Sequence, residues 1–189
     1  MDIAILDAIQ EHLRSPLLDT VMLIATHLGD LALVWLVASA VLTALPRYRR
    51  FGVAVFVAVA VTAALGMLVL KPLFGRARPF VTYEFAGLLI PPPSGDSFPS
   101  NHSMVSFAAA AALCCLPGKG KGIVLVKVAA VLVAGLIAFS RLYLYVHYPT
   151  DILAGAVIGV AVGLASVGAV TRLWPPSATP PGSAGTPSA

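Results

Sequence analysis

Residues 51–71 have the sequence FGVAVFVAVAVTAALGMLVLK, an apolar run that ends on one lysine. A helix that crosses the hydrocarbon core of a bilayer needs about 20 predominantly apolar residues. This run has that length, and Thr62 is the only polar side chain before Lys71. The stretch therefore predicts a transmembrane helix with a cation at one end.

The composition of the whole chain is typical of a membrane protein. Of its 189 residues, 59% are hydrophobic and 11% are charged, whereas a soluble domain has about 25% charged residues. The net charge of +4 could suggest nucleic acid as a partner, but the cations stand at the ends of apolar runs and not on one soluble face. We therefore expect a lipid bilayer and no nucleic acid as the partner, and the oligomeric state stays open.

Four more apolar runs predict membrane spans, at about residues 30–46, 102–117, 122–141 and 150–171. Residues 3–13 carry apolar side chains at helical spacing with acidic residues between them, which is typical of an interfacial helix. The predicted fold class is an all-α, polytopic membrane helix bundle. It has five to six transmembrane helices plus the N-terminal interfacial helix.

The pattern divides the chain into an N-terminal segment (1–28), a membrane domain (29–173) and a tail (174–189). Residues 17–27 are too short to span alone, so they either lie half-buried or continue the first helix through a kink. Residues 79–99 are rich in proline and predict a polar loop. The tail consists largely of Pro, Ser, Gly and Ala, and we expect it to be disordered.

Basic residues predict the orientation of the bundle. Cations are enriched in the loops on the cytoplasmic side of a membrane protein. The predicted spans place seven cations of this chain on the same side of the membrane, namely Arg47, Arg49, Arg50, Lys119, Lys121, Lys127 and Arg172. We therefore expect a plasma membrane protein whose other face, which carries the remaining polar loops, lies outside the cytoplasm.

Three polar stretches lie on that other face. They are KPLFGRARP at 71–79, PSNH at 99–102, and Ser140-Arg141 followed by His147 and Asp151. Ionisable side chains next to lipid are costly and mark functional sites by default. We therefore expect the three stretches to form one site.

The cations of this set suit a phosphate ligand. An arginine presents a planar fork of donors that matches phosphate oxygens, and a lysine adds a point charge. Lys71, Arg78 and Arg141 are the predicted phosphate-binding cations, although each could also be a cation that extends to the membrane surface. We assign Arg76 to the surface or to contact with lipid headgroups.

The stretch 99–102 opens a predicted helix. Ser100 or Asn101 suits an N-cap, and the free N–H groups at a helix start bind anions. A simple helix cap would explain both residues equally well, but it would not explain His102. An imidazole can pass protons near neutral pH, so His102 is a candidate acid and base.

His147 and Asp151 form the second candidate pair. A carboxylate four residues away can accept a hydrogen bond from one imidazole nitrogen and leave the other nitrogen free to attack. Packing at a helix start is the alternative for each residue taken alone. His12 and His27 stand outside the three polar stretches, and we assign them no role.

No metal site is predicted. Two histidines and an aspartate could ligate zinc. However, three cations at the same place would repel a metal ion, and they already supply the charge that a metal gives to phosphoryl transfer. We therefore expect no metal and no cofactor.

The order Lys71-x6-Arg78-Pro79, Pro99-Ser100-x-His102 and Ser140-Arg141-x5-His147-x3-Asp151 resembles the type 2 phosphatidic acid phosphatase superfamily. These are membrane lipid phosphatases that share their core with soluble vanadium haloperoxidases. The resemblance implies that His147 is the nucleophile, that Asp151 orients it, and that His102 is the acid and base. It also implies a set of phosphate ligands, namely Lys71, Arg78, Ser100, Arg141 and the backbone of Asn101.

One position departs from the family pattern, because Asn101 stands where a glycine is common. We expect activity to survive, since asparagine tolerates unusual backbone angles and its amide can bond a phosphate. The expected substrate is a polyprenyl diphosphate such as undecaprenyl diphosphate, and phosphatidic acid or phosphatidylglycerol phosphate is the alternative. A lipid transporter or a non-catalytic lipid-binding protein is the alternative of another class.

Overall fold

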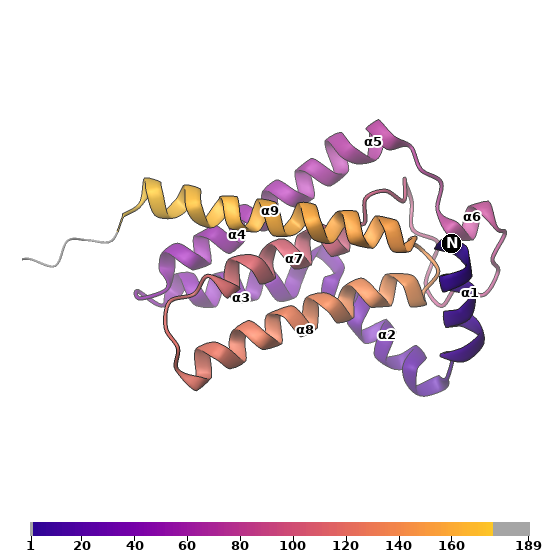
Figure 1. Cartoon of the computed structure of the whole chain (residues 1–189), viewed down its shortest axis with the longest axis horizontal. Coiled ribbons are helices and arrows are strands. Elements are labelled where there is room, and N and C mark those ends of the chain that lie inside the picture. Colours follow the sequence, from indigo (N-terminus) through magenta and orange to yellow (C-terminus); the bar gives the residue numbers. More distant parts are fainter. Residues whose placement is uncertain (1, 176–189) are drawn as a thin grey trace, which may run out of the picture.

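The computed structural model describes residues 2–175, and over this range every regular element is helical (Figure 1). The all-α prediction is therefore confirmed. In chain order the elements are α1 (Asp2–His12), α2 (Pro16–Gly29), the 3-10 turn η1 (Asp30–Ala32), α3 (Leu33–Ala44), α4 (Arg49–Ala64), the π-helical η2 (Leu65–Leu70), α5 (Lys71–Phe74), α6 (Pro79–Thr82), α7 (Asn101–Cys114), α8 (Lys121–Tyr143) and α9 (Pro149–Leu173). The predicted tail lies outside the described residues except for Trp174 and Pro175.

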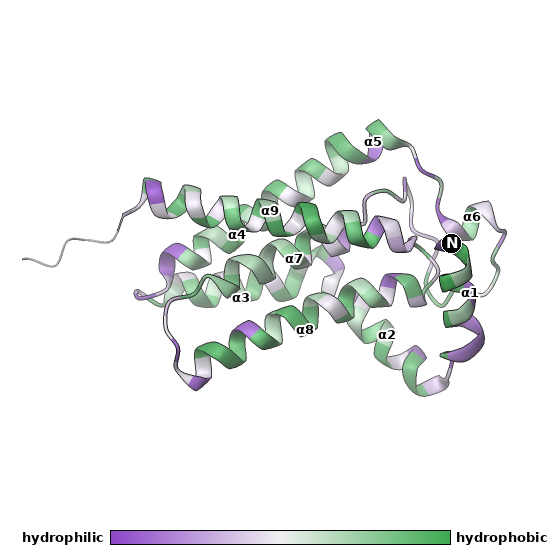
Figure 2. Ribbon diagram, in the orientation of Figure 1, coloured by the Kyte–Doolittle hydropathy of each residue, from purple (hydrophilic) through white to green (hydrophobic). Residues whose placement is uncertain are grey.

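Four helical stretches are long and apolar enough to cross a membrane. They cover Pro16–Ala44, Arg49–Thr82, Lys121–Tyr143 and Pro149–Leu173. Hydrophobic residues fill the middles of these helices, and hydrophilic ones gather toward their ends (Figure 2). The fifth predicted span is α7, which has 14 residues and is roughly 21 Å long, shorter than the ~30 Å of hydrocarbon that a bilayer presents.

The predicted span at 30–46 begins earlier than expected. It joins α2 through η1, where Leu31 and Ala32 take the left-handed conformation with φ of 52° and 57°. The alternative in which residues 17–27 continue the first helix is wrong. Ser15 is the N-cap of α2, and its Oγ accepts a hydrogen bond from the N–H of Leu18 at 3.3 Å, so a new helix begins there.

The core of the bundle is the contact between α7 and α9. Residues 108–112 of α7 are all alanines, and all are buried. On the facing side of α9, a Cβ added at Gly159 or Gly163 would overlap the carbonyl oxygen of Met104 or Ala108. Small residues let helix backbones approach closely in membrane bundles. This packing holds the middle of α9 directly against the backbone of α7.

The two ends of the bundle differ. The α3–α4 and α7–α8 connections and the last residues of α9 lie at one end, whereas α1, α5, α6 and the α8–α9 connection lie at the other (Figure 1). The seven cations used above to predict orientation belong to the first end or to helix residues near it. The three polar stretches meet at the second end.

Candidate active site

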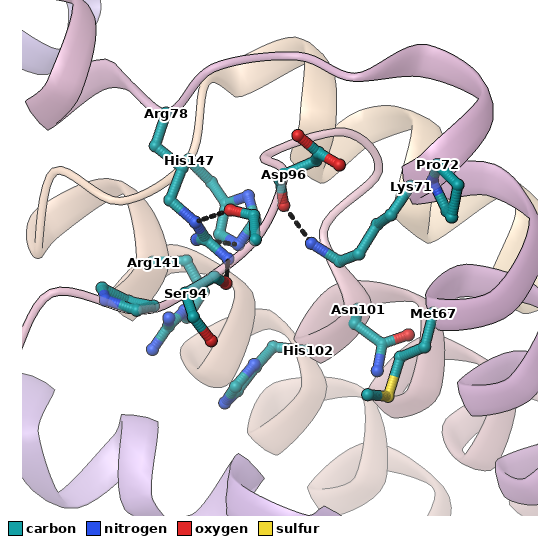
Figure 3. A pocket seen from close by; sticks show the side chains of 12 residues that line it. Met67, Lys71, Pro72, Arg78, Ser94, Asp96, Asn101, His102, Arg141 and His147 are labelled. Atoms are coloured by element: carbon teal, nitrogen blue, oxygen red, sulfur yellow. Dashed lines mark hydrogen bonds between the residues drawn. The ribbon is translucent and has the colours of Figure 1, made fainter.

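A cavity of about 390 Å³ at the second end is lined by residues from all three polar stretches. Six of the predicted site residues line it, namely Lys71, Arg78, Asn101, His102, Arg141 and His147. Figure 3 shows their side chains around the same space. They come from α5, the segment before α6, α7, α8 and the α8–α9 loop.

His147 is buried in the loop between α8 and α9, with 2% of its surface exposed. Its Nε2 lies 3.2 Å from a guanidinium nitrogen of Arg78. Because arginine can only donate, Nε2 must be the bare nitrogen and Nδ1 must carry the proton. Nδ1 lies 3.4 Å from Asp151 Oδ2 and 3.4 Å from Ser97 Oγ. The ring is therefore held with an unprotonated nitrogen at the cavity.

Burial also fixes the charge of this ring. The loss of water around His147 lowers its pKa to about 3, although Asp151 opposes this shift and the nearby Arg141 and Arg78 add to it. The imidazole is therefore neutral at physiological pH. A neutral imidazole with a bare nitrogen is the form that can attack phosphorus.

Asp151 is fully buried in the first turn of α9 and accepts several hydrogen bonds. Its Oδ2 accepts from the backbone N–H of Tyr148 at 2.9 Å and from the hydroxyl of Ser97. Its Oδ1 accepts from Arg76 at 2.6 Å. These partners fix the carboxylate beside His147.

The prediction for Arg76 was wrong. Its guanidinium does not simply face the surface, because it pairs with Asp151 and also stacks 3.8 Å above the ring of Tyr148. A second nitrogen lies 3.3 Å from Asp2 of α1. Gly75 has a positive φ of 54° and turns the chain after α5, so Arg76 leaves the helix and reaches α9.

Lys71 and Arg78 are both held by the loop that precedes α7. Arg78 donates to the carbonyl oxygens of Gly95 at 2.9 Å and Ser94 at 3.2 Å. Lys71 donates to the carbonyl of Asp96. Figure 3 shows both side chains directed toward this loop. Carbonyl oxygens thus occupy donors that a phosphate could use.

Arg141 lies in the last turn of α8 with 4% of its surface exposed. One guanidinium nitrogen donates to the hydroxyl of Thr26 from α2. Its Nε has no partner among the described residues. A buried cation with an unused donor, on the wall of the cavity, fits an anionic ligand.

Ser100 and Asn101 occupy different positions relative to the cavity. Ser100 is fully buried and caps α7, where its Oγ accepts from the N–H of Ser103 at 3.5 Å. The helix-cap alternative therefore accounts for its side chain, and its role toward phosphate stays a prediction. Asn101 lines the cavity, and its buried Oδ1 has no partner among the described residues.

His102 follows in the first turn of α7 and also lines the cavity. Its Nε2 lies 3.2 Å from Asp30 Oδ1 at the η1 break. The remaining ring nitrogen, Nδ1, is thus the one available to a ligand. The site therefore holds two imidazoles, each paired with a carboxylate, together with three cations.

Sequence reasoning missed Arg76, Ser97 and Thr26. Arg76 stood within a quoted motif, but nothing in its spacing distinguished it from a surface cation. Ser97 lies in the segment PSGDSFPSNHS, where four serines fall within ten residues and none is singled out by pattern. Thr26 lies in an apolar run, and only the packing of α2 against α8 brings it to Arg141.

The residues of the cavity offer little to a metal ion. Among residues 2–175, no three His, Cys, Asp or Glu side chains gather closely enough to hold one. Lys71, Arg78 and Arg141 bring three positive charges to the cavity instead. The arrangement can bind a phosphoryl group, attack it with His147 and exchange a proton through His102.

Comparison with known proteins gives consistent matches. A model of the PAP2 superfamily matches residues 47–175. An undecaprenyl-diphosphatase from Sulfolobus acidocaldarius is 30% identical over 134 residues, which cover 71% of this chain but only 62% of that protein. A decaprenylphosphoryl-5-phosphoribose phosphatase from Mycobacterium tuberculosis is 32% identical over 168 residues, which cover 86% of each chain.

A solved structure agrees with the sequence matches. The PAP2 type phosphatidylglycerolphosphate phosphatase from Bacillus subtilis superimposes with a TM-score of 0.74 at 27% identity, over 91% of this chain and 85% of that one. The family model covers well over half of the sequence, including all three motifs. The chain therefore belongs to the PAP2 superfamily of membrane lipid phosphatases.

Proposed function

We propose that this protein is a metal-independent phosphatase that hydrolyses a polyprenyl diphosphate, such as undecaprenyl diphosphate, through a phosphohistidine on His147. The observation that carries the proposal is the state of His147. Its bare Nε2 lies at the cavity beside Arg78, while its other nitrogen faces a buried carboxylate. This arrangement prepares a neutral nucleophile next to cations that bind phosphoryl oxygens.

In the first step, Lys71, Arg78 and Arg141 bind the oxygens of the terminal phosphoryl group. Phosphate oxygens replace the carbonyls of residues 94–96 on the first two cations. His147 Nε2 then attacks the phosphorus, and the bond from phosphorus to the bridging oxygen breaks. That oxygen keeps the electron pair and takes a proton from His102.

The second step is hydrolysis of the phosphohistidine. His102 has lost its proton and now accepts one from a water molecule that attacks the phosphorus. The bond between phosphorus and Nε2 breaks, inorganic phosphate leaves, and His147 is neutral again. Asp151 stays ionised throughout and stabilises the positive charge that the phosphorylated ring carries.

Two observations support a lipid with a long apolar tail. A second cavity of about 290 Å³ shares Met67, Asn101 and His102 with the first. Its other walls are largely apolar, and Val59, Val105 and Leu31 contribute to them. Two relatives are named for polyprenyl-linked substrates. Phosphatidylglycerol phosphate or phosphatidic acid is the second candidate, and the name of the solved bacterial relative supports the first of these two lipids.

We also propose that the site faces outward from the plasma membrane. The cations that follow the positive-inside rule lie toward the end of the bundle opposite the cavity. A lipid diphosphate of the outer leaflet would then present its phosphates at the level of the cavity.

The proposal is tested by phosphate release from the purified protein in detergent, with a chelator present. Undecaprenyl diphosphate and phosphatidic acid are compared at equal mole fraction in the micelle, and His147→Ala serves as the blank. Faster release from the diphosphate, absent in the variant, supports the proposed substrate. Faster release from phosphatidic acid would favour the second candidate. Binding of either lipid without release would favour the lipid-transport or lipid-binding alternative.

A further inference from the structure

His102 is held by a residue outside the three motifs. The carboxylate of Asp30 lies at the break between α2 and α3, and its Oδ1 is 3.2 Å from His102 Nε2. The two residues are 72 positions apart in the sequence. The N-terminal part of the chain, which precedes the matched family region at 47–175, thus contributes directly to the surroundings of the site.

The backbone around Asp30 has an unusual conformation. Leu31 and Ala32 have φ of 52° and 57°, a region in which residues other than glycine are uncommon. Two successive residues of this kind interrupt a stretch that would otherwise continue as one helix. The break follows directly after Asp30, whose carboxylate reaches His102 in the first turn of α7.

Gly29 makes a close approach to His102 possible. A Cβ at this position would lie 2.6 Å from His102 Cδ2 and 2.8 Å from Ile137 Cγ2. The backbone of α2 therefore packs directly on the imidazole edge. Contact on the ring and a hydrogen bond at Nε2 together leave the ring little freedom to rotate.

The other oxygen of Asp30 is also occupied. Its Oδ2 lies 2.8 Å from Nδ1 of His27. The carboxylate is thus held between two imidazoles, one from its own helix and one from α7. The contact of Oδ2 with His27 favours the orientation in which Oδ1 faces His102.

We propose that Asp30 is a positioning residue for His102, and this proposal rests on the acid and base role given to His102 above. Asp30 accepts a hydrogen bond from Nε2–H, so the proton of the neutral ring stays on Nε2 and Nδ1 is bare toward the cavity. When Nδ1 is protonated, the negative charge of Asp30 stabilises the imidazolium. Asp30 itself takes no proton.

The pairing gives His102 a defined role in both steps. In the first, the proton on Nδ1 passes to the leaving oxygen, and the ring becomes neutral. In the second, the bare Nδ1 takes a proton from the attacking water. Without Asp30, the neutral ring could carry its proton on Nδ1 and would then be unable to act as the base.

The test uses Asp30→Asn and Asp30→Ala in the full-length protein in detergent. Asparagine can occupy the same space but cannot stabilise the imidazolium. We expect kcat to fall by at least about tenfold in both variants, and by no more than in His102→Ala, for which a loss of roughly 100- to 10,000-fold is typical. KM should change by less than about threefold, because the phosphate-binding cations are untouched.

The control is Glu11→Gln, which removes an exposed carboxylate of α1 that lies away from the cavity. It should keep kcat within about twofold of the parent protein. Thermal unfolding of all variants shows whether each one is folded. An Asp30→Asn protein that unfolds like the parent and keeps its kcat would overturn the proposal.

A second readout does not depend on activity. In protein labelled with ¹⁵N-histidine, the ring signals that are lost in His102→Ala belong to His102. At a pH at which the ring of His102 is neutral, we expect a protonated Nε2 and a bare Nδ1 in the parent, and a shift toward the other tautomer in Asp30→Ala. Unchanged His102 signals in Asp30→Ala would overturn the proposal. If the parent protein releases no phosphate from any lipid, the proposed function fails, whereas the tautomer measurement still decides the role of Asp30.

Discussion

The carboxylate of Asp151 is held by several partners at once. It has no exposed surface and accepts hydrogen bonds from a backbone N–H, a serine hydroxyl and the guanidinium of Arg76. A carboxylate in such a place needs its partners, because a buried charge without them is costly. The position of His147 therefore depends on residues that never touch the substrate.

This dependence predicts the effect of changing Arg76. Arg76→Gln removes the positive partner of Asp151 Oδ1 and should destabilise the protein by about 1–3 kcal/mol. It should also lower kcat more than it raises KM, because Arg76 does not line the cavity. The measurement is steady-state kinetics with thermal unfolding in detergent. Arg172→Gln, at the other end of α9, is the control, and equal effects of the two changes would contradict the account.

The burial of His147 predicts a dependence of stability on pH. Its pKa falls to about 3 on folding, from the usual value near 6.5. Between pH 6.5 and pH 3 the imidazole is therefore protonated in the unfolded chain but not in the folded protein. As pH falls through this range, this difference lowers the free energy of unfolding. Between pH 6.5 and pH 5 the loss is about 2 kcal/mol.

The check compares the parent protein with His147→Gln. Thermal unfolding is followed at pH 7 and at pH 5 in the same detergent. The parent should lose more stability than the variant over this range. If both lose the same amount, the imidazole is not held neutral by burial.

Contacts within the site were predictable from sequence where a motif brought several chemical groups together. The pairing of His147 with Asp151 followed from a spacing of four residues at a helix start. The contacts of Arg76 and Ser97 with Asp151 did not follow, because they depend on a turn at Gly75 and on the path of an irregular loop. Asp30 lies outside the three motifs, and no sequence pattern indicated its contact with His102.

At the scale of helices, the contact of α7 with α9 positions the site. Gly159 lies against the carbonyl of Met104, two residues after His102. Ser100 N–H also donates to the carbonyl of Asp151 at 3.2 Å, which joins the two helix starts. The two motifs that carry His102 and Asp151 are thus held together by backbone contact.

This contact predicts a difference between two glycines of α9. Gly159→Ala puts a methyl group onto the Met104 carbonyl and should destabilise the protein by about 1–3 kcal/mol. Gly168→Ala meets nothing within 4 Å and should be neutral or slightly stabilising. Thermal unfolding of both variants in one detergent decides the matter. A Gly159→Ala protein as stable as the parent would show that the helices do not pack this closely.

Helix existence and order followed from the apolar runs, because length and hydropathy are local properties. The bounds of the first span could not be predicted in this way. Residues 17–27 and 30–46 join across η1, and this connection depends on the left-handed conformation of residues 31 and 32. The shortness of α7 was visible in the sequence. Its place in the centre of the bundle was not, because alanine-rich helices suit either the core or the lipid.

At the scale of the whole molecule, the site and the basic loops lie toward opposite ends. This arrangement predicts which residues face outward in a cell. In a protein whose native Cys114 and Cys115 are replaced by alanine, Ala86→Cys adds a thiol to the exposed loop after α6. It should react with a membrane-impermeant maleimide in intact cells.

The control for this labelling keeps only the native Cys114, which is exposed near the opposite end of α7. It should react only after the cells are permeabilised. The reverse pattern would place the cavity on the cytoplasmic side and would exclude a substrate in the outer leaflet.

According to the proposed mechanism, His147 becomes phosphorylated during turnover. The most direct measurement is to quench the protein in alkali within the first turnover of a lipid substrate labelled with ³²P in its terminal phosphate. We expect label on the protein that survives alkali, is lost in acid, maps to His147 and is absent from His147→Ala. Phosphate release at the normal rate by His147→Ala, or label that maps to another residue, would contradict it.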